Sequence, residues 1–223
     1  MSLKRHHFRI AAFFDVDLTL CERDSFRYFL REEYICNPWN WRFAPCVFIF
    51  GLLRKMRLIS LPNFKEKAIV SLAGKSKSFI QKKGKFFLKT HLLNTIRHKG
   101  MEKIIWHKKN GHLVFIATSS PDIYIKPLVE YLMCDGYVCS RLNYQDNVFT
   151  GRFEGKDCLG IEKVERLRKI RTDFSIDLGQ SYAYSDHESD LPLLEWVGNP
   201  AAVNPTAVFH KIATEKGWAI EQW

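Results

Sequence analysis

The sequence lacks a CxxC pair, an apolar run long enough to cross a membrane, and any internal repeat. Its six cysteines are scattered along the chain, which argues against a zinc site. Only a short apolar run follows residues 1–7, so no secretory signal is predicted and we interpret the cysteines as reduced thiols. These absences favour a cytoplasmic protein, and 223 residues suffice for one core with a smaller insertion.

Acidic residues are scarce in one quarter of the chain. Residues 54–109 contain sixteen Lys and Arg but only two acids, Glu66 and Glu102, whereas the whole chain has a net charge of +10. Such a basic segment indicates an acidic partner, namely anionic lipid, nucleic acid or a phosphorylated substrate. The alternative is a solvated, lysine-rich helical surface.

Charge of either sign is missing from Phe43 to Leu53, eleven residues that follow Trp39 and Trp41. Spanning a bilayer takes about 20 apolar residues, so this segment is too short. The tryptophans and the basic stretch from Arg54 to Arg57 favour contact with a membrane interface. Burial in an ordinary core is the alternative interpretation.

The apolar pattern predicts buried strands that alternate with helices. Strands are expected over 8–14, 112–117, 181–184 and 201–203, with mostly helical structure over 39–98 and a hairpin over 142–153. Ser120 is expected to cap a helix that begins at Pro121. Alternating strands and helices predict a Rossmann-like α/β fold, with a parallel sheet that has helices on both faces. Ligands of such folds bind beyond the carboxyl ends of the strands.

Polar clusters follow the first two of these strands. Asp15 and Asp17 come directly after the first, and a bound cation would offset their repulsion. Thr118 follows the second, where a hydroxyl and the N–H groups of a helix start could hold phosphate. The alternatives are two loop aspartates that cap the next helix and a plain helix cap at Thr118.

Two more candidates lie in the second half of the chain. Asp186 and Asp190 follow the strand predicted over 181–184, and the alternative is an ordinary acidic loop. Lys163 lies on a predicted amphipathic helix, where a solvated lysine is the common case.

Together these clusters resemble the motifs of the haloacid dehalogenase-like (HAD) phosphohydrolases. The four motifs read DVDLT, IATSS, the lysine of IEKVERL, and SDHESD, and the resemblance covers about residues 8–205. The insertion after the first motif, the TGR at 150–152 and the segments CLGIEKVERL and DLPLLEWVGNPAAVNP are similar to the phosphoserine phosphatase branch. The apolar segment and basic region resemble the layout of HAD-type phosphatidylglycerophosphate phosphatases. Leu18 and Ser185 depart from the family, where glycine is common.

The resemblance implies a catalytic core of residues 1–30 and 100–223, with a helical cap of residues 31–99. It implies that Asp15 is the nucleophile that becomes phosphorylated and that Asp17 is the general acid and base. Asp15, the backbone carbonyl of Asp17 and Asp186 would bind Mg²⁺. The expected hydrogen-bond partners of the phosphoryl group are Thr118 and Lys163.

Two further acids are given supporting roles by the same resemblance. Asp190 would orient Lys163 or a metal-bound water. Asp24 matches an acidic position that contacts substrate in phosphoserine phosphatases, although an N-cap of the next helix explains it equally well. No role is expected for His187, which we interpret as an exposed loop histidine.

The predicted function is therefore a Mg²⁺-dependent phosphatase that forms an aspartyl-phosphate. Its substrate is expected to be a lipid head-group phosphate such as phosphatidylglycerophosphate, reached at the inner face of the membrane. The alternative substrate is a soluble metabolite such as phosphoserine or histidinol phosphate. A remote alternative is nucleic-acid binding through the basic region, for which no motif is visible. The sequence does not indicate an oligomeric state.

Overall fold

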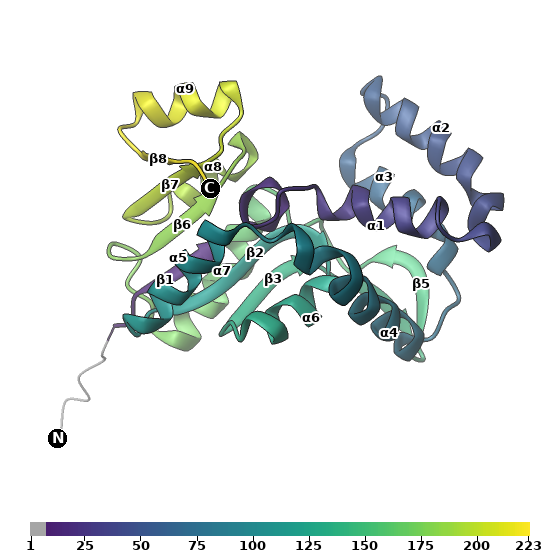
Figure 1. The fold of residues 1–223 in the computed structure, drawn as a ribbon, viewed down its shortest axis with the longest axis horizontal. Helices are drawn as coiled ribbons and strands as arrows, with labels where there is room; N and C mark the ends of the chain where they lie inside the picture. The colour runs from purple at the N-terminus through teal and green to yellow at the C-terminus, as the bar shows by residue number, and fades with distance from the viewer. Residues whose placement is uncertain (1–7) are drawn as a thin grey trace.

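The computed structural model describes residues 8–223, which contain a parallel sheet of six strands in the order β3-β2-β1-β6-β7-β8 (Figure 1). All neighbouring strands in this sheet run parallel. The predicted Rossmann-like α/β fold is therefore confirmed. The strands are β1 (Ala11–Phe14), β2 (Leu113–Pro121), β3 (Gly136–Ser140), β6 (Tyr182–Ser185), β7 (Asn199–Val203) and β8 (Ala219–Glu221).

The central strands are buried on both faces, which explains why β1 reads as a continuous apolar run. Alternate residues of β1 enter different cores, with Phe14 in one and Phe13 in the other. The first core is closed by residues of α1, α4, α5 and α6, and the second by residues of α7, α8 and α9. These helices are α1 (Ser25–Tyr34), α4 (Lys77–Phe87), α5 (His98–Lys109), α6 (Asp122–Leu132), α7 (Ile161–Phe174), α8 (Leu191–Leu194) and α9 (Ala207–Glu215).

The chain between β1 and β2 is mostly helical, as the sequence predicted. Besides α1, α4 and α5 it contains α2 (Ala44–Lys55), α3 (Leu61–Ala68) and several short helical turns. Figure 1 shows α1, α2, α3 and α4 at the end of the molecule away from β6, β7 and β8.

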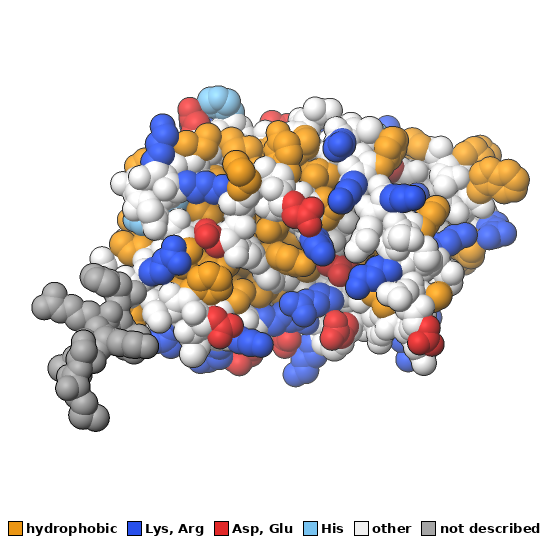
Figure 2. Space-filling view, turned by 90° about the horizontal axis from the view of Figure 1, so that it is seen from below, with side chains coloured by type: hydrophobic (Ala, Val, Ile, Leu, Met, Phe, Trp, Pro, Cys, Tyr) orange, Lys and Arg blue, Asp and Glu red, His pale blue; other side chains and the backbone are white. Residues whose placement is uncertain are grey.

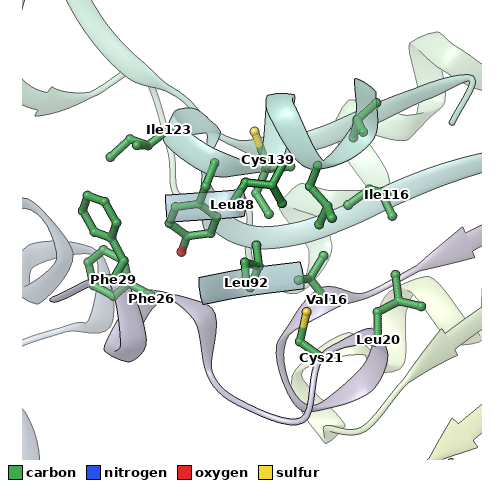
Figure 3. Close-up of a cluster of buried hydrophobic side chains, with 14 of the residues drawn as sticks. Val16, Leu20, Cys21, Phe26, Phe29, Leu88, Leu92, Ile116, Ile123 and Cys139 are labelled. Atoms are coloured by element: carbon green, nitrogen blue, oxygen red, sulfur yellow. The ribbon is translucent and has the colours of Figure 1, made fainter. Parts of the chain in front are cut away.

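A shared apolar cluster fixes this helical segment to the sheet (Figure 3). Leu88 and Leu92 are almost completely buried in the turn that follows α4. In Figure 3 they lie between Phe29 of α1 on one side and Ile116 of β2 on the other. Burying side chains of this size stabilises the arrangement by about 1.5–3 kcal/mol each.

Helix α2 differs from the other long helices because none of its residues is buried. It includes most of the apolar segment 43–53, which contributes no buried residue to the core, although Phe43 and Val47 are partly buried and pack against the core. Phe48, Ile49 and Leu52 are exposed by 73%, 55% and 50%. Within residues 8–223 no helix has the length and apolar character needed to span a bilayer.

The predicted hairpin is present as β4 (Leu142–Gln145) and β5 (Val148–Phe153), in a separate two-stranded antiparallel sheet. Its turn residues Asp146 and Asn147 both have positive φ, as tight hairpin turns require. The hairpin bonds to the helical segment, since Lys77 N–H donates to Asn147 O (2.8 Å).

Three details differ from the sequence predictions. The first strand begins at Ala11 rather than Phe8, and β8 was not predicted. Strand β2 continues to Pro121, which pairs with β3 beyond a register shift, so α6 begins at Asp122. The prediction that Ser120 caps this helix is therefore wrong, because the Ser120 hydroxyl is engaged elsewhere.

Candidate active site

The sequence-predicted polar clusters lie at one edge of the sheet, beyond the carboxyl ends of β1, β2 and β6. The register pairs Phe14 with Ile116 on one side and with Tyr184 on the other. Parallel pairing therefore places Asp15 beside the chain leading to Thr118 and beside the chain leading to Asp186. Residues far apart in the sequence meet there because all three strands point the same way.

Asp15 and Lys163 form the buried centre of this site. Lys163 extends from α7, and its Nζ lies 2.8 Å from Asp15 Oδ1 and 2.6 Å from Asp190 Oδ2. Burial raises the pKa of Asp15 well above its usual value, Lys163 opposes that rise, and neighbouring carboxylates add to it. Burial disfavours the charged form of Lys163, but the two carboxylates outweigh that effect and its pKa is raised. The lysine is therefore a fixed positive charge at the site.

Asp17 is held by two hydrogen bonds from other elements. The backbone N–H of Ser25, at the start of α1, donates to Asp17 Oδ1 at 2.6 Å. The hydroxyl of Ser120, near the end of β2, donates to Asp17 Oδ2 at 2.6 Å. Ser120 was not among the predicted site residues, although its position two residues after Thr118 could have indicated a role in the site. These bonds fix the direction of a carboxylate that is only partly buried.

Asp15 and Asp186 converge on a single hydroxyl. Thr19 Oγ1 lies 3.4 Å from Asp15 Oδ2 and 3.3 Å from Asp186 Oδ1. Burial is the main cause that raises the pKa of Asp186 to about 6. Two buried carboxylates near one hydroxyl repel each other, and the positive charge of Lys163 balances only part of their negative charge.

This arrangement fits a bound Mg²⁺ ion. Asp15 and Asp190 both pair with the buried cation Lys163, Asp186 shares the Thr19 hydroxyl with Asp15, and Asp190 Oδ1 is buried without a hydrogen-bond partner. Carboxylate and carbonyl oxygens are the ligands Mg²⁺ prefers, and it keeps several of its waters. Among residues 8–223 no three His, Cys, Asp or Glu side chains are grouped so that they could hold a metal ion by themselves.

Thr118 lies fully buried within β2, and its Oγ1 accepts a hydrogen bond from Ser120 N–H at 3.1 Å. Because α6 begins four residues later, Thr118 is not at a helix start as the sequence suggested. Its hydroxyl hydrogen is still free to donate to a ligand, since the hydroxyl acts here as an acceptor.

The two residues that depart from the family pattern differ in their structural setting. Leu18 has a φ of 61°, a left-handed conformation that glycine adopts without strain and leucine only at a cost. Ser185 is fully buried, and its hydroxyl donates to Asp190 Oδ2 at 2.7 Å. The serine thus adds a hydrogen bond that glycine could not make.

Asp24 caps α1, because its Oδ1 accepts from Arg27 N–H at 2.8 Å. The N-cap interpretation of this residue is confirmed. Burial and the Asp17 carboxylate raise the pKa of Asp24, so it also belongs to the electrostatic surroundings of the site. His187 is exposed in the loop after β6, as predicted.

Lys65 is a buried charge that the sequence did not single out. It extends from α3 and is only 3% exposed, and its Nζ donates to Ser119 O at 2.7 Å and to Asp157 Oδ2 at 2.9 Å. Ser119 follows Thr118 directly, so Lys65 ties the helical segment to the backbone beside the site. It is one of many lysines in a basic region, and nothing in its local sequence distinguishes it.

A cavity of about 1270 Å³ lies elsewhere, between α5 and the strands β6, β7 and β8. Its walls include Trp106, Trp218 and Trp223. None of Asp15, Asp17, Asp186 and Asp190 lines it, so this cavity is separate from the candidate active site.

Comparisons with known proteins agree with the motifs. The model of the haloacid dehalogenase-like hydrolases matches residues 12–195. The phosphoserine phosphatase SerB1 of Mycobacterium tuberculosis is 28% identical over 217 residues, which cover 96% of this chain and 70% of that protein. A histidinol-phosphatase of Neisseria meningitidis is 32% identical over 118 residues, which cover 51% of this chain and 53% of that protein.

Similarity also extends to solved structures. The crystal structure of a protein of unknown function from Bordetella pertussis matches with a TM-score of 0.84 and 24% identity. The match covers 96% of this chain and 98% of that chain. It shows that the complete arrangement of elements recurs in another protein.

Proposed function

This chain belongs to the haloacid dehalogenase-like hydrolases and is a phosphatase similar to phosphoserine phosphatases, and we propose that it works through an aspartyl-phosphate on Asp15 with Mg²⁺ bound. The observation that carries this proposal is the meeting of Asp15, Asp17, Asp186 and Lys163 at one sheet edge. Hydrolysis of a phosphate monoester requires a nucleophile, neutralisation of the phosphate charge and a proton for the leaving group. These residues can supply all three.

The first step is an attack of Asp15 on phosphorus. A bond forms between its carboxylate oxygen and phosphorus while the bond from phosphorus to the ester oxygen breaks. Asp17 gives its proton to the departing alcohol, for which its fixed direction suits it. Water then attacks the phosphorus and loses a proton to Asp17, while the bond from phosphorus to the Asp15 oxygen breaks. Inorganic phosphate leaves, and both aspartates return to their starting state.

The transferred phosphoryl group needs positive charge and hydrogen-bond donors around it. Lys163 supplies a permanent charge next to Asp15, held in place by Asp190. Thr118 has a free hydroxyl hydrogen for one phosphoryl oxygen. Asp15, the Asp17 carbonyl and Asp186 would hold Mg²⁺, which neutralises phosphate charge when bound.

The helical segment of residues 31–99 is proposed to act as a cap that selects the substrate, on a core made of the rest. Lys65 supports this role, because it joins α3 to the backbone beside Thr118. Asp24 is the candidate for contact with the substrate from α1, in addition to capping that helix.

For the substrate we propose a lipid head-group phosphate such as that of phosphatidylglycerophosphate. Support comes from the exposed apolar side chains of α2 and the basic residues around it. A soluble metabolite is the second candidate, favoured by the similarity to proteins named phosphoserine phosphatase and histidinol-phosphatase.

Nucleic-acid binding by the basic region is a weaker proposal. In α4, Ile80, Gly84 and Phe87 are buried while Lys82 and Lys85 are exposed, which is the pattern of an amphipathic helix packed on a core. An affinity for DNA or RNA that falls steeply with salt would favour it.

Phosphate release tests the reaction. The purified chain is given Mg²⁺ and phosphoserine, histidinol phosphate or phosphatidylglycerophosphate in mixed micelles. Release that disappears with Asp15→Asn is expected, since the variant keeps the shape of the side chain but not its nucleophile. The preferred substrate decides between lipid and metabolite. Undiminished release by Asp15→Asn would contradict the proposed nucleophile.

A further inference from the structure

The outward face of α2 is apolar, the reverse of what a helix on the surface of a protein usually shows. Pro45, Phe48, Ile49 and Leu52 of α2 and Met56, which follows it, are all exposed. At about 100° per residue these positions fall within an arc of about 100° on one side of the helix. The stripe that meets solvent is therefore continuous rather than a scatter of single side chains.

Exposed apolar side chains also flank this stripe. Trp39 and Trp41 precede α2 with 87% and 59% of their surface exposed, and Leu58 follows it with 64% exposed. Exposed apolar residues that occur singly are normal, whereas a contiguous group marks an interaction surface. We name these residues the α2 face: Trp39, Trp41, Pro45, Phe48, Ile49, Leu52, Met56 and Leu58.

Every charged residue in the stretch of chain that contains the α2 face is positive. No Asp or Glu occurs between Glu33 and Glu66, whereas Arg42, Lys55 and Arg57 are exposed beside the apolar residues. Figure 1 places α2 at the upper right of the molecule, and Figure 2, which views the molecule from below, shows hydrophobic and basic side chains with a few acidic ones at the right-hand end. An apolar stripe bordered by cations complements a surface that is apolar inside and negatively charged outside.

We propose that the α2 face inserts into the interface of an anionic lipid bilayer and holds the enzyme there as a peripheral protein. Helices that lie in this interface bury an apolar face among the head groups and acyl chains, and attraction to anionic lipid adds to their binding. Exposed tryptophans suit this layer, because their rings are apolar and their N–H group remains near water. Basic residues close to the membrane surface attract its anionic lipids.

Membrane binding would bring the enzyme to its proposed lipid substrate and thus rests on the proposed function, but it does not depend on the reaction at Asp15. Binding is therefore measured with the Asp15→Asn variant, without any catalysis. The probe is a vesicle of phosphatidylcholine with 30% phosphatidylglycerol, compared with phosphatidylcholine alone, and bound protein is separated by flotation. We expect binding to the anionic vesicles that weakens as salt is added.

Substitutions separate the apolar and electrostatic contributions. Phe48→Ser with Leu52→Ser should weaken binding at least about tenfold, because two side chains no longer enter the bilayer. Lys55→Gln with Arg57→Gln should weaken it about thirtyfold on anionic vesicles at low salt. The matched control is Tyr131→Ser with Val208→Ser, two exposed apolar positions on α6 and α9 that should leave binding unchanged.

Thermal unfolding by circular dichroism shows whether each variant is folded, and all replaced side chains are exposed, so little loss is expected. Three results would overturn the proposal. The first is a folded protein that stays unbound with anionic vesicles. The second is that the Phe48→Ser, Leu52→Ser variant binds the anionic vesicles as tightly as the protein without these two substitutions. The third is a protein that is a dimer in solution but becomes a monomer with these two substitutions, since the α2 face would then join two copies of the chain.

Discussion

Lys65 Nζ lies 2.9 Å from Asp157 Oδ2, and both side chains are only 4% exposed. The lysine comes from α3 in the helical segment, and the aspartate from the loop before α7. Ser140 of β3 also donates to this aspartate. One buried ion pair therefore joins the segment that is proposed to select the substrate to the loop before α7.

Lys65→Met should cost about 3–5 kcal/mol of the free energy of unfolding, because it leaves the Asp157 carboxylate buried and unpaired. Urea unfolding measures the loss. Lys67→Met is the matched control on the same helix, since Lys67 is exposed. Adding Asp157→Asn to Lys65→Met should recover part of the stability, because the unpaired charge is removed. An equal, small effect of both lysine substitutions would show that the pair contributes little.

Ser120→Ala should slow phosphate release about ten- to a hundredfold, because Asp17 loses one of its two fixing hydrogen bonds and bonds to charged groups are worth about 1.5–3 kcal/mol. Steady-state rates with saturating Mg²⁺ measure the effect. Ser119→Ala is the control, since Ser119 accepts hydrogen bonds through its backbone carbonyl and its hydroxyl bonds to no other side chain or backbone group of residues 8–223. The role assigned to Ser120 is wrong if both variants keep the wild-type rate.

Chelation with EDTA should stop phosphate release, and added Mg²⁺ should restore it. Asp186→Asn should raise the Mg²⁺ concentration for half-maximal activity about tenfold or more, because a carboxylate ligand becomes a neutral amide. Glu188→Gln, two residues along the same loop, serves as the control because this side chain bonds to Thr206 instead. An unchanged Mg²⁺ requirement in Asp186→Asn would remove Asp186 from the metal site.

Acidic pH should destabilise the fold through His107. This side chain is fully buried, with its ring nitrogens bonded to His112 and Tyr184. Burial, then His112 and Lys103, lower the pKa of His107 to about 3, whereas 6.5 is usual. Between these values the unfolded chain binds more protons than the folded one, so stability rises with pH in this window and is lost as pH falls through it.

Urea unfolding at several pH values between about 4 and 7 tests this prediction. His107→Gln should give a flatter dependence of stability on pH, since the titrating group is gone. His210→Gln, at an exposed position of α9, should keep the slope of the wild-type protein. If His107→Gln and the wild-type chain lose stability in parallel, another group controls the acid sensitivity.

Several features of the fold were predictable because they depend on local patterns. Short apolar runs gave the central strands, and the Asp146-Asn147 pair gave the hairpin turn. Boundaries were less predictable, since the extension of β2 to Pro121 depends on pairing with β3. Edge strand β8 was missed, because Ala219–Glu221 is only three residues long and forms through pairing with β7.

The sequence by itself determined the chemical groups of the site and the edge at which they gather. Asp15, Thr118 and Asp186 follow apolar runs, and the carboxyl ends of parallel strands share one edge. Only the tertiary structure decided which side chains hold these groups in place, as Ser120 does for Asp17. It also decided that the apolar segment of α2 faces outward, because composition reports how apolar a segment is, whereas exposure depends on what packs against it.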